Sequence, residues 1–268
     1  MGKIIISSDN HIDVNRLERE MILDQQAQYL IDQKVDVYLM AGDWYNYFEK
    51  TLRFAEDLQD MIGPKTIVRF LAGNHEMGHG ITFDELEQDL SPLYFHNKSL
   101  KLGDLTLIGN NGWYDYSFAQ GPQKEQVSQF KNGFYYDGLI KQPMSDFERT
   151  TLSLNQIQQH LAATSVDQKV LMVQHFVPHN LDLSYPAKFP KWQMINGVMG
   201  SQRYVDLYRT DARIQQIIYG HAHLNLPMRQ IRAGKYYNVS VGYRRAKAIE
   251  WTETTFFENW VKKLYQNR

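Results

Sequence analysis

The stretch QQIIYGHAHL, residues 215–224, places two potential metal ligands directly after a strand-like run. Residues 214–219 are rich in isoleucine, which is typical of a strand inside a layered fold. The run ends at Gly220, and His221 and His223 follow it one residue apart. Imidazole is the commonest metal-binding side chain. The stretch therefore indicates both a sheet and a functional site at the edge of that sheet.

Similar apolar runs followed by polar side chains recur along the chain. They alternate with segments of helical period, which is the pattern of an α/β layered fold. We expect strands over residues 4–7, 35–40, 66–71, 105–108, 169–173, 214–219 and 236–241. We expect helices after the capping pair Asn15 and Glu18, before the Gly63-Pro64 stop, after the capping pair Ser145 and Glu148, and along the apolar face of Phe256, Trp260 and Leu264. No repeat or linker divides the 268 residues, so we expect one domain over 1–268.

The segment 110–144 fits neither period and is rich in aromatic side chains. A connection this long between a strand and a helix is more often functional than plain. We expect it to form a loop or lid beside the site. Aromatic packing beneath a long loop explains the composition equally well.

Composition excludes several classes of site and partner. The formal net charge of −1 gives no field that would gather nucleic acid or an anionic membrane surface. The chain has no cysteine, so any metal must be held by nitrogen and oxygen. The apolar run at the N-terminus is too short for a signal peptide, and no run approaches the length of a membrane span. We therefore expect a cytoplasmic protein that does not enter a membrane.

Side chains that can bind metal ions follow five of the expected strands. They lie in the sequences Asp9-Asn10-His11, Gly42-Asp43, Gly73-Asn74-His75-Glu76, Gln174-His175 and Gly220-His221-Ala222-His223. Loops after the carboxyl ends of strands in an α/β sheet meet on one edge, so these residues should converge. The glycines fit this placement because they let the backbone turn sharply before a ligand.

The candidate ligands form a chemically coherent set. Carboxylates, one amide oxygen and several imidazoles suit Mn, Fe, Zn, Co or Ni better than Ca. They are too many for one open catalytic ion, whereas two ions about 3.5 to 4 Å apart would use them all. Each motif alone is weak evidence, and the specificity lies in the ordered set. The sequence predicts a centre for two divalent transition-metal ions, with Mn as the first choice.

This ordered set resembles the calcineurin-like metallophosphoesterases, whose pattern is DxH, GD, GNH followed by an acid, a histidine and GHxH. The resemblance spans Asp9 to His223 and implies an α/β fold of two sheets in a β-sandwich flanked by helices, with the metal site at the carboxyl ends of the strands. It implies a hydrolase in which a hydroxide that bridges two metal ions attacks phosphorus. The implied substrate is a small-molecule phosphodiester or phosphomonoester.

The resemblance also assigns roles to individual residues. It implies one metal held by Asp9, His11, Asp43 and His223, and another held by Asp43, Asn74, His175 and His221. Asp43 would bridge the two ions and would be catalytic together with His75. His75 would face the substrate and either stabilise charge on the phosphoryl group or protonate the leaving oxygen.

The sequence departs from the protein-phosphatase branch of that family. The branch continues GD as GDxVDRG, whereas here Asp43 is followed by Trp44-Tyr45-Asn46-Tyr47. Asn46 can still accept a hydrogen bond from His75, but it carries no charge, and the arginine that grips phosphate is gone. These departures argue against a phosphoprotein phosphatase and against a symmetrical dinucleotide tetraphosphatase.

Aromatic residues near the motifs are candidates for substrate contact. Trp44, Trp113 and Tyr114 could stack on a base or another flat group, with Asn46 beside them. This interpretation predicts a nucleotide-like or aryl phosphoester. In the alternative interpretation, the aromatic side chains pack beneath the metal-binding loop.

Two other functions stay open. A nuclease could use the same scaffold if Arg203, Arg209, Arg213 and residues 244–247 formed a basic patch, although the net charge disfavours a nucleic-acid partner. The sequence leaves the oligomeric state undetermined. The third interpretation is a non-catalytic metal-binding scaffold, and the complete ligand set together with His75 argues against it.

Overall fold

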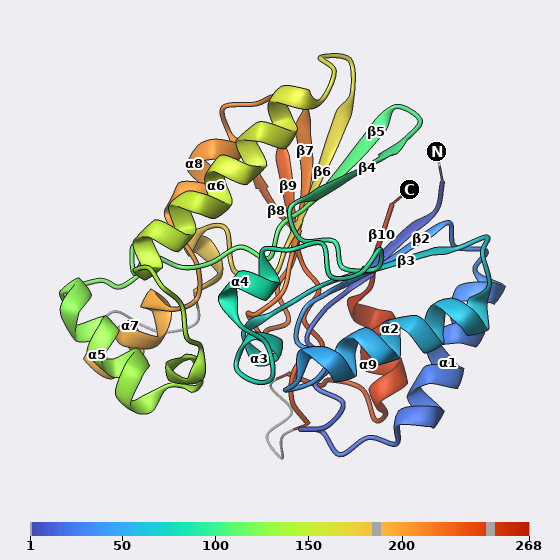
Figure 1. The fold of residues 1–268 in the computed structure, drawn as a ribbon, viewed down its shortest axis with the longest axis horizontal. Helices are drawn as coiled ribbons and strands as arrows, with labels where there is room; N and C mark the ends of the chain where they lie inside the picture. The colour runs from blue at the N-terminus through green and yellow to red at the C-terminus, as the bar shows by residue number, and fades with distance from the viewer. Residues whose placement is uncertain (1, 184–188, 245–249, 268) are drawn as a thin grey trace.

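The structure of the protein, a computed structural model, describes residues 2–183, 189–244 and 250–267. Its centre consists of two sheets with strand orders β10-β1-β2-β3 and β4-β5-β6-β7-β9-β8 (Figure 1). The first sheet contains β1 (Ile4–Ser7), β2 (Val37–Ala41), β3 (Ile67–Leu71) and β10 (Tyr265–Gln266). The second contains β4 (Lys98–Leu102), β5 (Leu105–Gly109), β6 (Lys169–Gln174), β7 (Ile214–Tyr219), β8 (Arg229–Ile231) and β9 (Gly234–Asn238). The strands β4, β8 and β10, each at the edge of a sheet, are antiparallel to their neighbours, and the other pairs are parallel.

Helices cover the outer face of each sheet (Figure 1). The first sheet is covered by α1 (Arg19–Asp32), α2 (Phe48–Ile62) and α9 (Phe256–Lys263), and the second by α6 (Asp146–Ala163) and α8 (Gln202–Tyr208). The remaining helices are α3 (Asn74–Met77), α4 (Phe83–Leu86), α5 (Lys124–Phe134) and α7 (Pro190–Gly197), with short 3₁₀ turns η1 (Tyr136–Leu139) and η2 (Asn180–Asp182). No helix in the described ranges is long and apolar enough to cross a bilayer.

The inner strands β1, β2, β5 and β6 are largely apolar because both faces of each sheet are covered. Successive side chains of a strand point to opposite faces. In β1, Ile4 and Ile6 therefore pack between the two sheets, and Ile5 packs against the helices of the first sheet. In β6, Leu171 packs between the sheets and Met172 packs against the helices of the second sheet. The prediction of a two-sheet sandwich flanked by helices is confirmed.

The two sheets are joined by backbone hydrogen bonds just beyond the carboxyl ends of β1 and β9. The amide of Ser8 donates to the carbonyl of Val239 at 3.2 Å, and the amide of Val241 donates to the carbonyl of Ser8 at 3.0 Å. The Asn15 side chain adds a bond of 3.1 Å to the carbonyl of Gly242. This junction brings the carboxyl ends of strands from both sheets to one place.

The expected strands agree with the structure to within a few residues. The sequence did not predict β4, β8 and β10, because these short edge strands are partly exposed and polar and lack an apolar run. It also missed α5, whose buried positions in the aromatic-rich segment are only Val127 and Lys131. A helix with so little apolar surface shows no clear helical period.

Helix boundaries were predicted with mixed success. The Ser145–Glu148 capping box and the end of α2 at Gly63, which has φ of 80°, are confirmed. The predicted capping pair Asn15–Glu18 is wrong. Helix α1 begins at Arg19, its N-cap Glu18 makes no side-chain capping bond, and Asn15 instead holds the loop after β9.

The C-terminal helix α9 packs on the first sheet through Phe256 and Trp260, which are buried as expected. We expect Phe256→Ala to lower the free energy of unfolding by about 3 kcal/mol or more, because a buried aromatic side chain leaves a cavity. Phe134 is 86% exposed, so Phe134→Ala is a matched control and should change stability by less than about 0.5 kcal/mol. Urea unfolding of both variants measures the difference, and equal losses would contradict the packing of α9.

Candidate metal centre

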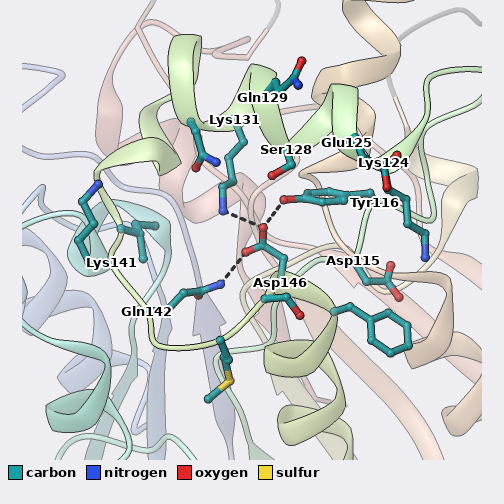
Figure 2. Close-up of a pocket in the computed structure, with 15 residues that line it drawn as sticks. Asp115, Tyr116, Lys124, Glu125, Ser128, Gln129, Lys131, Lys141, Gln142 and Asp146 are labelled. Atoms are coloured by element: carbon teal, nitrogen blue, oxygen red, sulfur yellow. Dashed lines mark hydrogen bonds and ion pairs between the residues drawn. The ribbon is translucent and has the colours of Figure 1, made fainter.

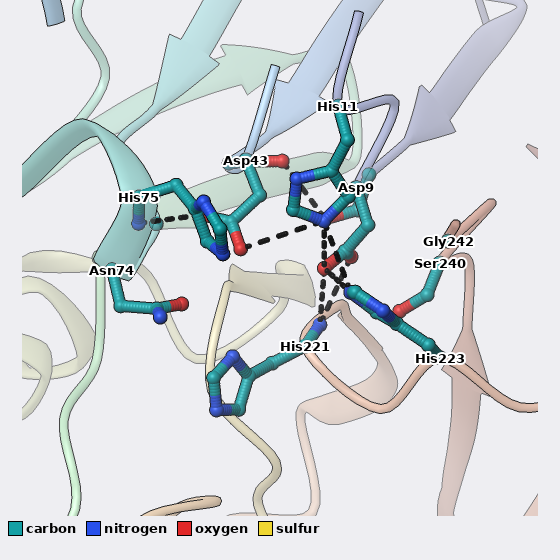
Figure 3. Close-up of polar contacts among 12 residues, drawn as sticks. Asp9, His11, Asp43, Asn74, His75, His221, His223, Ser240 and Gly242 are labelled. Carbon is teal, nitrogen blue, oxygen red and sulfur yellow. Dashed lines mark hydrogen bonds and ion pairs between the residues drawn. The ribbon is translucent and has the colours of Figure 1, made fainter. Parts of the chain in front are cut away.

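The residues predicted to bind metal ions converge in the structure, although their strands lie in different sheets. One group of potential ligands consists of Asp9, His11, Asp43 and His223, and a second consists of Asp43, His175 and His221. Within each group the ligand atoms lie within 4.8 Å of one another (Figure 3). The two groups share Asp43. This division coincides with the one that the resemblance implied.

The backbone at the ligands is turned sharply. Asp9, His11, Asp43 and His221 have φ values of 57°, 44°, 59° and 66°, in the left-handed region that residues other than glycine seldom adopt. Such conformations cost free energy and cluster at functional sites, where the surrounding structure enforces them. The ligand residues themselves make most of the turns that we had expected of the preceding glycines.

Two of these glycines serve different purposes. Gly42 has φ of 93° and does supply a turn. Gly73 has an ordinary φ of −92°, but a Cβ there would lie 2.1 Å from Oδ1 of Asp43. At Gly73 the requirement is therefore for space beside the carboxylate of Asp43, which both ligand groups share.

The carboxylate of Glu76 fixes the loops after β2 and β3. Its oxygens accept hydrogen bonds from the amides of Asp43 at 2.8 Å, Trp44 at 2.7 Å and Gly73 at 2.9 Å. The hydroxyl of Thr51 donates a further bond of 2.8 Å. Burial and the negative charge of Asp43 raise the pKa of Glu76 to about 7, despite these hydrogen bonds. Glu76 thus sets the position of the ligand that both groups share.

The imidazoles are oriented by bonds on the side away from the centre. Nδ1 of His175 donates to the carbonyl of Ala41 at 2.9 Å, which turns Nε2 toward Oδ2 of Asp43, 3.3 Å away. Nδ1 of His223 lies 3.2 Å from the carboxylate of Glu250, and its Nε2 lies 2.9 Å from Oδ1 of Asp9. Outer partners of this kind fix the tautomer and direction of metal-binding histidines. Glu250 lies in no sequence motif, so sequence reasoning missed it.

The electrostatics of the site fit bound cations. Burial lowers the pKa of His175 and of His223, but the neighbouring carboxylates outweigh it and raise these pKa values to about 9 and about 10. Burial and the charge of His175 lower the pKa of His221 to about 3, which keeps this imidazole neutral. Nε2 of His221 is buried and forms no hydrogen bond with any described residue. Paired carboxylates that hold protons on imidazoles, together with this unpartnered nitrogen, fit divalent ions bound by nitrogen and oxygen.

His75 lies beside the ligand groups without belonging to either. Its Nδ1 is 2.6 Å from Oδ1 of Asn46, as predicted, and its Nε2 is 3.0 Å from the hydroxyl of Tyr243. The ring of Tyr136 stacks on it with 4.3 Å between centroids and 15° between planes. An amide oxygen can only accept, so the bond to Asn46 places a proton on Nδ1 and directs Nε2 into the pocket.

A cavity of about 590 Å³ opens onto the ligands. Besides the polar groups of the site, it is lined by tyrosine and apolar side chains, namely Tyr135, Tyr136, Ile195, Met199, Leu224 and Tyr243. Tyr135 and Tyr136 come from the aromatic-rich segment, which therefore does border the site. Ile195, Met199 and Tyr243 lie in no motif, and sequence reasoning missed them.

Three residues predicted to contact substrate need correction. Trp44, Trp113 and Tyr114 are fully buried and belong to the hydrophobic core on the helix side of the first sheet. They do not line the cavity at the metal ligands. Their aromatic surface is consumed by packing, which was the alternative interpretation of these residues. The pocket tyrosines take their place as candidates.

Trp113 is held by a buried polar cluster around Asp146. The cluster borders a second cavity of about 700 Å³ (Figure 2). The carboxylate of Asp146 accepts bonds from Nε1 of Trp113 and from Gln142, both at 2.8 Å, from Lys131 at 2.7 Å, and from the hydroxyl of Tyr116. These bonds link α5 to the start of α6. They fix the segment that carries Tyr135 and Tyr136.

The arginines proposed as a basic patch are engaged elsewhere. Arg209 pairs with Asp206 at 2.6 Å, Arg213 pairs with Asp211 at 2.6 Å, and Arg203 donates to Thr151 at 2.9 Å. Arg244 is exposed, whereas residues 245–247 lie outside the described residues. These contacts give no added support to a nuclease.

Comparison with solved structures shows the fold. Phosphopantetheinyl hydrolase from Mycobacterium tuberculosis matches with a TM-score of 0.67 and 15% identity, covering 99% of this chain and 95% of that chain. The Thermus thermophilus protein TT1561 matches with a TM-score of 0.54 and 10% identity, covering 99% and 98%. A dimetal phosphatase from Danio rerio matches with a TM-score of 0.52 and 12% identity, covering 88% and 86%.

Comparison of the sequence with curated proteins gives no match. The profile of the calcineurin-like phosphoesterases, in contrast, matches residues 2–225, which include every predicted metal ligand. The order of the motifs, the convergence of their side chains and this match agree. The chain belongs to the calcineurin-like phosphoesterases, hydrolases of phosphoric ester bonds.

Proposed function

We propose that this protein hydrolyses a phosphoester of a small molecule at a centre of two divalent metal ions. The observation that carries the proposal is the pair of ligand groups that share Asp43. Asp9, His11 and His223 would complete one site, and Asn74, His175 and His221 would complete the other. The nitrogen and oxygen donors suit Mn, Fe, Zn, Co or Ni, and we propose Mn as the first to test.

When bound, a pair of divalent ions supplies a nucleophile from water at neutral pH and neutralises charge on the phosphoryl oxygens. The chain's own residues position the reacting groups. Asp43 orients both sites through one carboxylate, and Glu76 holds the backbone of Asp43 through a 2.8 Å bond. His75 directs Nε2 into the pocket, where it contacts the phosphoryl group or gives a proton to the leaving oxygen. Burial lowers the pKa of His75, so the hydroxyl of Tyr243, 3.0 Å from Nε2, is a second source of that proton.

The pocket favours an ester with an organic group that contacts tyrosine and apolar side chains. Tyr135, Tyr136 and Tyr243 offer flat faces, and Ile195, Met199 and Leu224 offer apolar contact. A nucleotide-like or aryl group fits this lining, as does a longer aliphatic group. The name of the Mycobacterium tuberculosis structure, a phosphopantetheinyl hydrolase, adds a phosphodiester with an extended organic arm to the substrates to test.

The two alternatives are weaker. A nuclease needs a surface that binds the phosphate backbone, and Arg203, Arg209 and Arg213 pair with acids or a hydroxyl. A scaffold without activity would have no use for His75 oriented toward the pocket. The complete ligand set and the position of His75 favour an enzyme.

Hydrolysis of bis-p-nitrophenyl phosphate and p-nitrophenyl phosphate tests the proposal. Metal-stripped protein should regain turnover with Mn, Zn, Ni or Mg, and the ratio of the two rates separates a diesterase from a monoesterase. Asp43→Asn should lose bound metal and more than about 100-fold of the activity together, because both sites share this carboxylate. Asp167→Asn, at an exposed position, is the matched control. Activity of Asp43→Asn at the level of this control would refute the proposal.

His75→Ala should keep the metal content of the unsubstituted protein and lose about 10²- to 10⁴-fold in kcat, the usual contribution of a proton-transfer group. The loss should be larger for an alkyl leaving group than for p-nitrophenolate, which departs without a proton. His160→Ala removes a histidine far from the pocket and should leave kcat unchanged. Metal analysis by mass spectrometry accompanies the assay, and full turnover of His75→Ala would remove His75 from the mechanism.

Tyr135→Ala should lower kcat/KM for bis-p-nitrophenyl phosphate about 10-fold, the effect of losing one stacking contact. Methyl p-nitrophenyl phosphate has the same leaving group and a small second ester group, so it should be affected much less. Phe134→Ala changes the neighbouring, 86% exposed side chain and should leave both substrates unaffected. Equal losses for the two substrates would contradict an organic-group contact at Tyr135.

A further inference from the structure

Among the proposed ligands, Asn74 alone presents an amide. An amide has an oxygen that can bind a metal ion and an NH₂ group that cannot, and a rotation of the side chain exchanges the two. Rotation of a carboxylate or an imidazole less often turns a group that cannot bind metal toward the ion. Asn74 therefore needs a partner that accepts from its NH₂ group and holds the oxygen toward the ion.

Asp137 is this partner. Its Oδ1 accepts a hydrogen bond of 2.8 Å from Nδ2 of Asn74, and both side chains are buried. The oxygen of Asn74 then lies 3.3 Å from Nε2 of His175, the atom that also faces Asp43 and His221. The bond from Asp137 thus directs the amide oxygen to the second ligand group.

Asp137 lies in η1, within the aromatic-rich segment 110–144. The neighbouring Tyr136 stacks on His75, and its hydroxyl donates to the carbonyl of His75 at 3.1 Å. The short turn η1 therefore contacts the side chain of Asn74 and both the ring and the backbone of His75. It joins this segment to the GNHE motif at two consecutive residues.

The turn η1 is itself held firmly against α5. A Cβ at Gly138 would lie 2.8 Å from the carbonyl oxygen of Lys131, so the turn packs directly on the helix. The side chain of Lys131 in turn forms the 2.7 Å ion pair with Asp146 at the start of α6 (Figure 2). Burial and the carboxylate of Asp137 raise the pKa of Tyr114, a fully buried residue of the same segment.

We propose that Asp137 is a positioning residue that holds Asn74 for the second metal site, formed by Asp43, Asn74, His175 and His221. The other site has separate support, since the carboxylate of Glu250 lies 3.2 Å from Nδ1 of its ligand His223. The segment 110–144 therefore controls occupancy of one metal site while it also lines the substrate pocket. This inference rests on the proposed two-metal function.

The consequence is selective loss of one ion. Outer partners of metal ligands contribute about 10- to 100-fold in metal affinity. Asp137→Leu keeps the size of the side chain and removes the acceptor, so the NH₂ group of Asn74 loses its partner. Asp137→Asn keeps an amide oxygen that can accept the same bond. The two variants separate the hydrogen bond from the volume of the side chain.

Titration calorimetry of the metal-stripped protein with Mn²⁺ tests the proposal. We expect two binding steps in the unsubstituted protein, and in Asp137→Leu one step weakened about 10- to 100-fold with the other unchanged. Asp137→Asn should restore the weakened step to within a few-fold. Asp115→Leu is the matched control, because Asp115 is a buried aspartate of the same segment that bonds the amide of Ser117 at 3.1 Å. It should keep both binding steps.

Two results would overturn the proposal. In one, both binding steps of Asp137→Leu are unchanged. In the other, both binding steps weaken equally in Asp137→Leu and in Asp137→Asn, which would mean general damage to the fold. Thermal unfolding of each variant shows whether it is folded. A single step in the unsubstituted protein would refute the two-metal function itself, so failure of the proposed function is distinguishable from failure of the role of Asp137.

Discussion

The site depends first on the buried carboxylate of Glu76. It binds the amides of Asp43, Trp44 and Gly73 and the hydroxyl of Thr51, and so joins the loops after β2 and β3 to helix α2. A buried carboxylate is costly unless hydrogen bonds compensate for the lost water, and here several donors do so. Because Asp43 serves both ligand groups, an error in the backbone position at this point would displace both sites. The left-handed conformation of Asp43 persists because Glu76 holds it on both sides.

The charges of the site couple metal binding to the stability of the fold. Asp9 and Asp43 are fully buried and stand close to imidazoles whose pKa values are raised to about 9 for His175 and about 10 for His223. Without cations, these protons compensate the carboxylates in an interior where unpaired charges are expensive. Metal ions would take over this compensation and release the protons, so binding should strengthen with rising pH and should stabilise the junction of the two sheets.

The sequence predicted the strands and the convergence of the candidate ligands well because both follow simple rules. Buried strands are short apolar runs, and the residues directly after their carboxyl ends meet at one edge. The supporting residues Glu250, Tyr243 and Asp137 could not be predicted, because they come from loops with no periodicity and meet the site only in space. The sequence also left open whether the aromatic side chains next to the motifs are buried. Trp44 and Trp113 pack inside, and His96, which lies in no motif, is 7% exposed and lies 3.1 Å from Glu87.

The motifs and the segment 110–144 contribute different things to the enzyme. The motifs supply ligands and His75 on loops that the two sheets hold in place. The segment supplies Tyr135 and Tyr136 to the pocket, and it is fastened by the cluster around Asp146 and by the guanidinium of Arg149, 3.7 Å from the ring centre of Trp113. A wall built this way exists before substrate arrives, so little ordering entropy is lost on binding. A change in the length or aromatic content of this segment would alter the substrate preference. Through Asp137, it would also alter the occupancy of the second metal site. The contacts of the short turn η1 therefore couple substrate selectivity to metal content in this chain.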